Sequence, residues 1–522
     1  MERKWWTLIA VSVAIFMLLL DITVVNVALP DIQRSLHSSF SDLQWVVNAY
    51  ALTLAAFLLT SGSVADLIGR KRVFVAGLVV FTTSSAVCGL STTPLMLNLA
   101  RAVQGTGGAM MFATALALLA QAFHGKERGT AFGVFGAVTG GAVAIGPVLG
   151  GVITSGIGWE WIFFVNVPIG VVAVFLTLSR VADSRDPNAT GVDWPGLVTF
   201  SGSLFLLVYA LVQGNEKGWG STEIVSFLIG AAVLMMLFIV VELRQSQPML
   251  DLSLFRRPAF SGASIVAFCL SASFFAMFLY LTLYIQDVLG YTPLQAGLRF
   301  LPSTLLSFIV APIAGRLSVR VPVRLLLGSG LLLIGIGLLT MTVVDAASSW
   351  TVLIPGFVLA GTGVGLVNPP LASTAVGVVP AEHSGMASGI NSTFRQVGIA
   401  TGIAGLGAVF QHSVTHGTTA ALIASGHARE IVSTAHGQLG TLLESGEVTR
   451  IANSLSPAAR TALDHSYRVG FTGAFTTIAA IAAMVALVGA VLGFVLVRTR
   501  DFVSAGELPA TQEPEPVAAA AG

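Results

Sequence analysis

Charged residues are scarce in this chain of 522 residues. Lys, Arg, Asp and Glu make up 10% of it, whereas 55% of its residues are hydrophobic. Because soluble proteins average about 25% charged residues, the composition predicts an integral membrane protein. The net charge of +1 also excludes any argument for nucleic-acid binding from overall charge, since that requires a large basic excess.

Cysteines and nucleotide-binding motifs are lacking as well. The two cysteines, Cys88 and Cys269, lie in separate apolar stretches, so we interpret them as small packing residues and not as a disulfide framework or a metal site. The chain has no GxxxxGK[ST] loop, which argues against direct use of ATP. No cluster of His, Cys or acidic residues lies within the apolar stretches. We therefore expect neither an enzyme nor a bound cofactor or metal.

Long apolar stretches are what the chain does have. A helix of about 20 apolar residues crosses a bilayer. The first stretch imitates a signal peptide, but Asp21 interrupts it and no small-residue cleavage site follows, so we interpret it as a transmembrane helix. We predict an all-α integral membrane protein with fourteen spans, near residues 6–28, 45–65, 73–91, 95–121, 130–154, 161–180, 194–213, 222–242, 260–285, 293–315, 324–344, 352–375, 385–409 and 470–497.

The basic residues indicate the orientation of these spans. They gather in alternate connections, such as those that contain Arg70 to Arg72, Arg256 and Arg257, and Arg316 to Arg324. Cytoplasmic connections carry the excess of Lys and Arg. We therefore expect both termini to be cytoplasmic and the chain to lie in the plasma membrane.

The sequence repeats itself at a fixed shift. Gly361 and Gly363 lie 256 positions after Gly105 and Gly107, and small residues at 129, 131, 133, 144 and 146 recur at 385, 387, 389, 400 and 402. Such a repeat is typical of transporters built from two related halves. We predict a six-helix half at 1–185, two additional helices at 186–245, and a second six-helix half at 246–500 with an external loop at 410–469, which we interpret as a tolerated insertion. Residues 501–522 are predicted to be a disordered cytoplasmic tail.

Three charged residues stand out inside the predicted spans: Asp21, Arg101 and Arg395. Charges at this depth are costly and are usually retained for function. Burial favours the protonated form of a carboxylate and a nearby cation favours the ionised form, so Asp21 could bind a proton or a cationic substrate, with Arg101 tuning it. The alternatives are an aspartate hydrogen-bonded to neighbouring polar side chains, and arginines tied to backbone carbonyls. Arg101 and Pro147 do not recur in the repeat, since Phe357 and Ile403 occupy the positions 256 residues later. We therefore place the coupling chemistry in the N-terminal half alone.

Two proline motifs predict irregular helices. Gly146–Pro147 removes a helical hydrogen bond and can bend the fifth span, although simple packing would also explain its glycines. Asn368–Pro369–Pro370 is predicted to break the twelfth span and to line a cavity. Other cavity candidates are aromatic, thioether and amide side chains, namely Met17, Tyr50, Met111, Tyr280, Tyr284 and Asn391.

A glycine-rich basic turn, GSVADLIGRKR, connects the second and third spans. Gly62 and Gly69 permit a close approach and a tight turn. Asp66 can accept hydrogen bonds from Arg70 or Arg72. The motif is either a positive-inside anchor or a charge-paired latch that opens when two halves of the protein move.

Together these motifs resemble the major facilitator superfamily, and within it the fourteen-span drug:proton antiporters. The resemblance covers about residues 1–410 and 470–497. It implies the major facilitator fold, with proton-coupling or substrate roles for Asp21, Asn26, Arg101, Gln104 and Arg395. It also implies conformational roles for Gly62, Asp66, Gly69, Arg70, Arg72, Gly146, Pro147, Gly150 and Gly151. The stretches that carry it are 20–30, 62–72, 101–105, 146–151, 159–168 and 389–398.

The function that we expect is export of amphipathic or cationic small molecules in exchange for protons, by a monomeric unit in the lipid bilayer. A dedicated exporter of one endogenous metabolite, lipid or natural product is the alternative within the same class. A receptor or scaffold that transports nothing is an alternative from another class.

Overall fold

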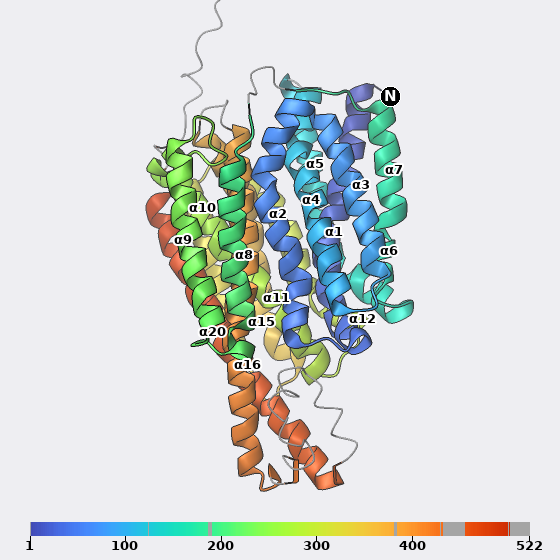
Figure 1. Cartoon of the computed structure of the whole chain (residues 1–522), viewed down its shortest axis with the longest axis vertical. Coiled ribbons are helices and arrows are strands. Elements are labelled where there is room, and N and C mark those ends of the chain that lie inside the picture. The colour runs from blue at the N-terminus through green and yellow to red at the C-terminus, as the bar shows by residue number, and fades with distance from the viewer. Residues whose placement is uncertain are drawn as a thin grey trace, which may run out of the picture.

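The computed structural model describes residues 2–123, 125–185, 191–379, 384–428, 430–431, 455–498 and 501. Within these residues the regular structure is entirely helical. Thirteen helices are long and apolar enough to cross a membrane, and one bent pair brings the number to fourteen. Figure 1 shows them as a bundle of roughly parallel helices. The prediction of an all-α membrane protein is confirmed, and each of the fourteen predicted windows falls on a helix.

The helices of the first half of the chain follow one another through short turns. Span 6 is interrupted at Val165, and α8 and α9 are the predicted additional pair. Their bounds are α1 (Arg3–Leu36), α2 (Phe40–Ile68), α3 (Arg70–Gly89), α4 (Pro94–Ala122), α5 (Gly125–Gly156), α6 (Trp161–Phe164), α7 (Asn166–Arg180), α8 (Trp194–Lys217) and α9 (Thr222–Arg244).

The second half contains more short helical pieces. Span 9 is built from α10, η2, α11 and η3, and span 10 is the pair α12–α13, bent by 41°. The bounds are η1 (Leu252–Arg256), α10 (Pro258–Leu270), η2 (Ser271–Phe275), α11 (Ala276–Leu283), η3 (Tyr284–Val288), α12 (Pro293–Arg299), α13 (Leu301–Leu317), α14 (Val323–Thr340), η4 (Met341–Val343), η5 (Trp350–Leu353), α15 (Ile354–Gly377), α16 (Ser384–Ala424) and α20 (Pro457–Leu496).

Polar caps mark where several spans begin. Ser39 and Asp42 form a capping box at the start of α2, and Thr292 and Gln295 form another at the start of α12. A capping box satisfies backbone N–H groups that the first turn of a helix leaves free. These polar turns lie at the end of the bundle opposite to the start of α1, which we call the outer end. The end at which α1 begins is the inner end.

The repeated glycines make equivalent contacts in the two halves. A Cβ added to Gly107 on α4 would lie 2.6 Å from the backbone nitrogen of Phe81 on α3. A Cβ added to Gly363 on α15 would lie 3.1 Å from the backbone nitrogen of Ile334 on α14. In both places glycine allows two helix backbones to touch, as in other membrane bundles. The repeat in the sequence therefore corresponds to a repeat of helix contacts.

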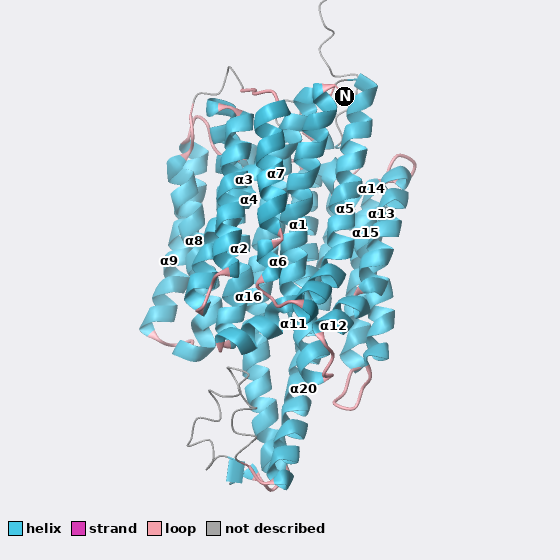
Figure 2. Ribbon diagram, turned by 90° about the vertical axis from the view of Figure 1, so that its right-hand side faces the viewer, coloured by secondary structure: helices cyan, strands magenta, loops and turns pink. Residues whose placement is uncertain are grey.

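The additional pair packs along one side of the bundle. Helix α8 contacts α2 and α16, whereas α9 packs mainly on α8, and both figures show the pair at the edge (Figures 1 and 2). Two buried carboxylates connect this pair to the chain that follows it. Asp193 accepts hydrogen bonds from the backbone N–H of Gly196 and Met249, and Glu242 accepts one from that of Leu250.

Within the described residues, the segment predicted as an external loop at 410–469 is largely helical. Helix α16 continues without a break to Ala424, and α20 begins at Pro457. Both helices project beyond the rest of the bundle at its outer end (Figures 1 and 2). Polar composition hid the extensions from a search for apolar spans, but a small cluster of Leu422, Ile431, Ala459 and Leu463 holds them together. Residues 432–454 and the predicted tail from 502 lie outside the described residues.

The predicted break at Asn368–Pro369–Pro370 is wrong. Helix α15 runs through both prolines from Ile354 to Gly377. Proline is tolerated inside a membrane helix where side chains and neighbouring helices compensate for the lost hydrogen bonds. Helix α5 likewise continues through Pro147.

The contacts of the repeated glycines lead to a prediction about stability. Gly107→Ala and Gly363→Ala should each lower the free energy of unfolding by about 1–3 kcal/mol, because the added methyl group overfills a close helix contact. Gly133→Ala is the matched control, since nothing lies within 4 Å of a Cβ at Gly133. It should be neutral or stabilising by up to about 1 kcal/mol. Thermal unfolding of the purified protein in detergent measures all three, and equal effects would contradict the prediction.

Candidate functional site

A buried polar network centres on Asp21, in the middle of α1. Its carboxylate is fully buried and is contacted from two other helices. Oδ2 lies 2.5 Å from Nη1 of Arg101 on α4. Oδ1 accepts hydrogen bonds from Nε2 of Gln104 at 2.9 Å and from Nδ2 of Asn166 at 3.1 Å. Both carboxylate oxygens of Asp21 therefore have polar partners in this structure.

The guanidinium of Arg101 is held on all sides. It donates to the side-chain oxygen of Gln104 at 2.7 Å and to the backbone carbonyl of Val46 at 3.1 Å. Its Cζ lies 4.2 Å from the centroid of the Tyr50 ring, a cation–π contact. Its side chain is 2% exposed. The sequence left two interpretations of Arg101 open, a partner of Asp21 and a tie to backbone carbonyls. In this structure Arg101 makes both kinds of contact.

The break in span 6 brings a further residue into the network. Asn166 is the first residue of α7, just after the interruption at Val165. Its Nδ2 also lies 3.0 Å from the hydroxyl of Ser85 on α3, which donates to the carbonyl of Phe163. Sequence reasoning did not assign Asn166 a role. The one signal in the sequence was that Asn166 belongs to the stretch 159–168, which contains polar residues and a proline.

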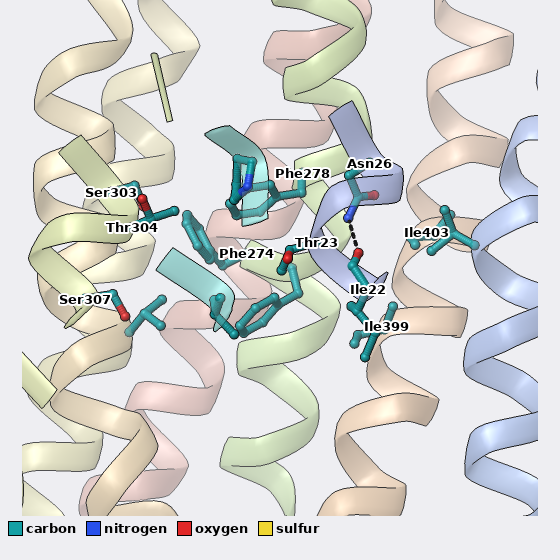
Figure 3. A pocket seen from close by; sticks show the side chains of 15 residues that line it. Ile22, Thr23, Asn26, Phe274, Phe278, Ser303, Thr304, Ser307, Ile399 and Ile403 are labelled. Carbon is teal, nitrogen blue, oxygen red and sulfur yellow. Dashed lines mark hydrogen bonds between the residues drawn. The ribbon is translucent and has the colours of Figure 1, made fainter. Parts of the chain in front are cut away.

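A separate cavity lies between the two halves. Its side chains border about 620 Å³ of space that no atom fills, part of which is open to solvent. Figure 3 shows its side chains on several different helices, with Phe274 and Phe278 between the α1 residues and the α13 residues. It is lined by Ile22, Thr23, Asn26, Val47, Val143, Pro147, Phe274, Phe275, Phe278, Ser303, Thr304, Ser307, Val364, Ile399 and Ile403.

Helix α1 serves both the network and the cavity. Asp21 points into the N-terminal half, whereas Ile22, Thr23 and Asn26 line the cavity. Within the described residues, the side chain of Asn26 donates one hydrogen bond, to the carbonyl of Ile22 one turn back in its own helix (Figure 3). The carboxylate of Asp21 does not line the cavity, so the network and the cavity are two sites joined by one helix.

The six cavity candidates from the sequence all lie elsewhere in this structure. All six side chains are buried, and none of them is among the residues that line the cavity. Met17, Tyr50 and Met111 belong to the N-terminal core. The hydroxyl of Tyr280 donates to the carbonyl of Ile403. The remaining two are Tyr284, which stacks on Phe475, and Asn391, which donates to the carbonyl of Ala263.

Arg395 lies apart from the Asp21 network. It is on α16, one turn before Ile399, and its Cζ is 5.9 Å from the centroid of the Phe275 ring. Ile399 and Phe275 both line the cavity. The described part of the chain offers Arg395 no ion pair. Its surroundings therefore differ completely from those of Arg101.

Three glycines of the fifth span lie in close helix contacts near the outer end of the bundle. A Cβ at Gly146 would overlap Thr23 on α1, and one at Gly150 would lie 2.9 Å from the carbonyl of Val24. A Cβ at Gly151 would lie 2.6 Å from the carbonyl of Pro293 on α12. Between the halves, Gln286 also donates to the carbonyl of Val27 at 2.7 Å. By contrast, no atom lies within 4 Å of a Cβ at 133, 136 or 141, in the inner part of α5.

The basic turn at 62–72 forms its ion pairs inside the N-terminal half. Nε of Arg70 lies 2.9 Å from the carboxylate of Asp66, as expected. Arg72 pairs instead with Asp183, after α7, at 3.3 Å. Gly69 has a φ of 118°, which L side chains rarely adopt, so the tight turn requires glycine. Gly62 faces open space, and no close approach depends on it in this conformation.

The buried ion pair leads to a prediction about stability. Asp21→Ala leaves Arg101 buried without a counter-ion and should cost about 3–5 kcal/mol of unfolding free energy. Replacing both residues with apolar ones should recover part of that loss. The control is Asp31→Ala, which removes a partly exposed pair with Arg34 on the same helix and should cost at most about 1 kcal/mol. Thermal unfolding of the purified proteins in detergent measures these changes in stability. Equal losses of stability from Asp21→Ala and Asp31→Ala would contradict the prediction.

Comparisons with known proteins agree with this architecture. Residues 11–403 match the model of the Major Facilitator Superfamily. The chain is 40% identical over 404 residues to the multidrug resistance protein Stp of Mycobacterium tuberculosis, covering 77% of this chain and 75% of the relative. It is 36% identical over 443 residues to the puromycin resistance protein pur8 of Streptomyces alboniger, covering 83% and 87%. It is 34% identical over 413 residues to the tetracenomycin C resistance and export protein of Streptomyces glaucescens, covering 79% and 77%.

Solved structures show the same fold. A bacterial homologue of the human lysosomal transporter Spinster, in an inward-facing and occupied conformation, superposes with a TM-score of 0.60 at 17% identity, covering 95% of this chain and 98% of that one. The structure of tetrameric PepTSo2 gives a TM-score of 0.57 at 15% identity, covering 94% of this chain and 97% of that one. At this level of identity the likeness concerns the fold alone. The chain belongs to the major facilitator superfamily and is a membrane transporter, not an enzyme.

Proposed function

We propose that this transporter is a proton-coupled antiporter that exports amphipathic small molecules, drugs among them, by alternating access. The single observation that carries the proposal is the arrangement around α1. One face of this helix holds a buried, titratable carboxylate, and another face lines the cavity between the halves. The names of the relatives, which include multidrug resistance and antibiotic export proteins, support the direction of transport.

The chemistry of the network supports proton coupling through α1. A proton on Asp21 would remove the counter-charge of Arg101, and an unpaired buried charge costs several kcal/mol. The network would have to rearrange, with movement of α1 against α4. Because Ile22, Thr23 and Asn26 belong to the same two turns as Asp21, the cavity wall would move with it. The proton and the substrate would thus bind at different places and communicate through one helix.

The distribution of contacts supports alternating access. The halves meet closely at the outer end, where Gly151 abuts α12 and Gly297 abuts Pro147. In the inner part of α5 a Cβ at 133, 136 or 141 would meet open space, and one at Gly140 would make only an ordinary contact with Phe308 at 3.5 Å. This arrangement supports a state of the proposed cycle that is closed to the outside. Opening to the outside would separate α5 from α12 and bring the inner ends together, where the 62–72 turn would act as the proposed latch.

The orientation follows from the charges of the connections. The inner end carries the basic turns, so we place it in the cytoplasm, with both described chain ends on that side because the number of spans is even. We place the protein in the plasma membrane as a monomeric transport unit. A dedicated exporter of one endogenous compound is the second candidate, and the relative named for tetracenomycin C export favours it.

The test is substrate-dependent proton movement in reconstituted vesicles. With an imposed pH gradient, wild-type protein should transport members of a panel that includes puromycin and tetracenomycin C, and each should release protons that a pH-sensitive dye reports. Asp21→Asn should reduce gradient-driven transport at least 100-fold, because the carboxamide cannot exchange a proton. Transport of one compound only would favour the dedicated exporter.

Asp31→Asn is the matched control for Asp21→Asn. It alters an acid on the same helix, near the outer end, that pairs with Arg34 and lies outside the cavity. It should transport like the wild type. Undiminished gradient-driven transport by folded Asp21→Asn protein would refute the assigned role of Asp21.

A further inference from the structure

The cavity between the halves has no acidic lining. None of its fifteen residues is charged, and Asp21, the acid next to Ile22 in the chain, faces the other way and is fully coordinated. A lipophilic cation bound here would have no counter-ion, and burial of an unpaired charge is unfavourable. The cavity therefore lacks an acidic group that would pair with a cation.

A cation, by contrast, stands at the edge of this cavity. Arg395 is on the inner side of Ile399 and lies against the ring of Phe275. Its side chain is partly exposed, and in the part of the chain that the structure describes no ionisable group interacts with it. Arg101 is the internal comparison, because that guanidinium is buried and has a carboxylate, an amide, a carbonyl and an aromatic ring around it.

An unpaired guanidinium at membrane depth is costly and marks a functional site. Its planar donors match a carboxylate or another flat oxyanion, often with two parallel hydrogen bonds. An anionic group on a bound ligand would supply the counter-charge that Arg395 lacks. Such a ligand would also enter from the inner end, because Arg395 lies on that side of the cavity.

The rest of the cavity wall favours an aromatic ligand with hydrogen-bonding groups. Phe274, Phe275 and Phe278 present three rings on successive turns of span 9. On the facing helix α13, the hydroxyl of Thr304 is buried and makes no hydrogen bond to the described residues. Figure 3 places Ser303 and Ser307 beside it on the same helix. Rings on one wall and hydroxyls on the other suit a flat aromatic molecule with polar substituents.

We propose that the cavity selects aromatic compounds that carry an acidic group, ionised as a carboxylate or phenolate, and that Arg395 pairs with this group. The proposal deepens the proposed function and rests on the cavity being the transport site. It replaces the expectation of cationic substrates, which depended on Asp21 facing the substrate.

The experiment measures equilibrium binding, so it does not depend on proton coupling. Purified full-length protein in lipid nanodiscs is titrated with two fluorescent probes that share one ring system, 1-pyrenebutyrate and (1-pyrenylmethyl)trimethylammonium. The wild type should bind the carboxylate at least 10-fold more tightly than the ammonium compound. Arg395→Gln should weaken binding of the carboxylate at least 10-fold and leave the ammonium compound unchanged, whereas Arg395→Lys, which keeps the charge, should retain most of the affinity.

The control is Arg299→Gln. Arg299 is another arginine of the predicted spans, but it lies against Tyr291 and Trp350, away from the cavity, so its replacement should not change either affinity. Tighter binding of the ammonium probe, binding of neither probe, or equal losses for both probes in Arg395→Gln would each overturn the proposal. Anion-selective binding without proton-coupled transport would instead count against the proposed function alone.

Discussion

A single ion pair inside the bilayer, between Asp21 and Arg101, constrains the N-terminal half of this protein. Neither charge can be left alone at that depth, so the helices that carry them must meet in one register. Gln104, Asn166 and the carbonyl of Val46 complete the coordination. These groups come from α1, α2, α4 and α7, so the pair determines how four helices are placed around one point.

Glycine supplies the second constraint, which is the distance between helices. In lipid no hydrophobic effect drives helices together, and close backbone contact takes its place. At Gly107 and Gly363 this contact holds helices within one half, and at Gly151 it holds α5 of one half against α12 of the other. Close contacts at glycine therefore occur both inside each half and between the two halves.

The separation between the charged network and the cavity gives each half its own task. The N-terminal half keeps a titratable group away from the cavity, and Phe357 and Ile403 stand where the second half would need Arg101 and Pro147. The second half supplies the aromatic rings of η2 and α11 and the hydroxyls of α13. Helix α1 belongs to the first half but lines the cavity, and so it is the physical connection between the two tasks.

The sequence by itself determined the membrane class, the fourteen spans, the internal repeat and the few residues that carry charge into the bilayer, because hydropathy and the cost of a buried charge are local properties. Only the tertiary structure decided which groups those charges meet. Asn166 reaches Asp21 through a break in span 6, and Tyr50 covers Arg101 without lining the cavity. The continuous helix through Pro369 and Pro370 and the outward extension of α16 likewise depend on contacts between segments far apart in the chain, which no local pattern contains.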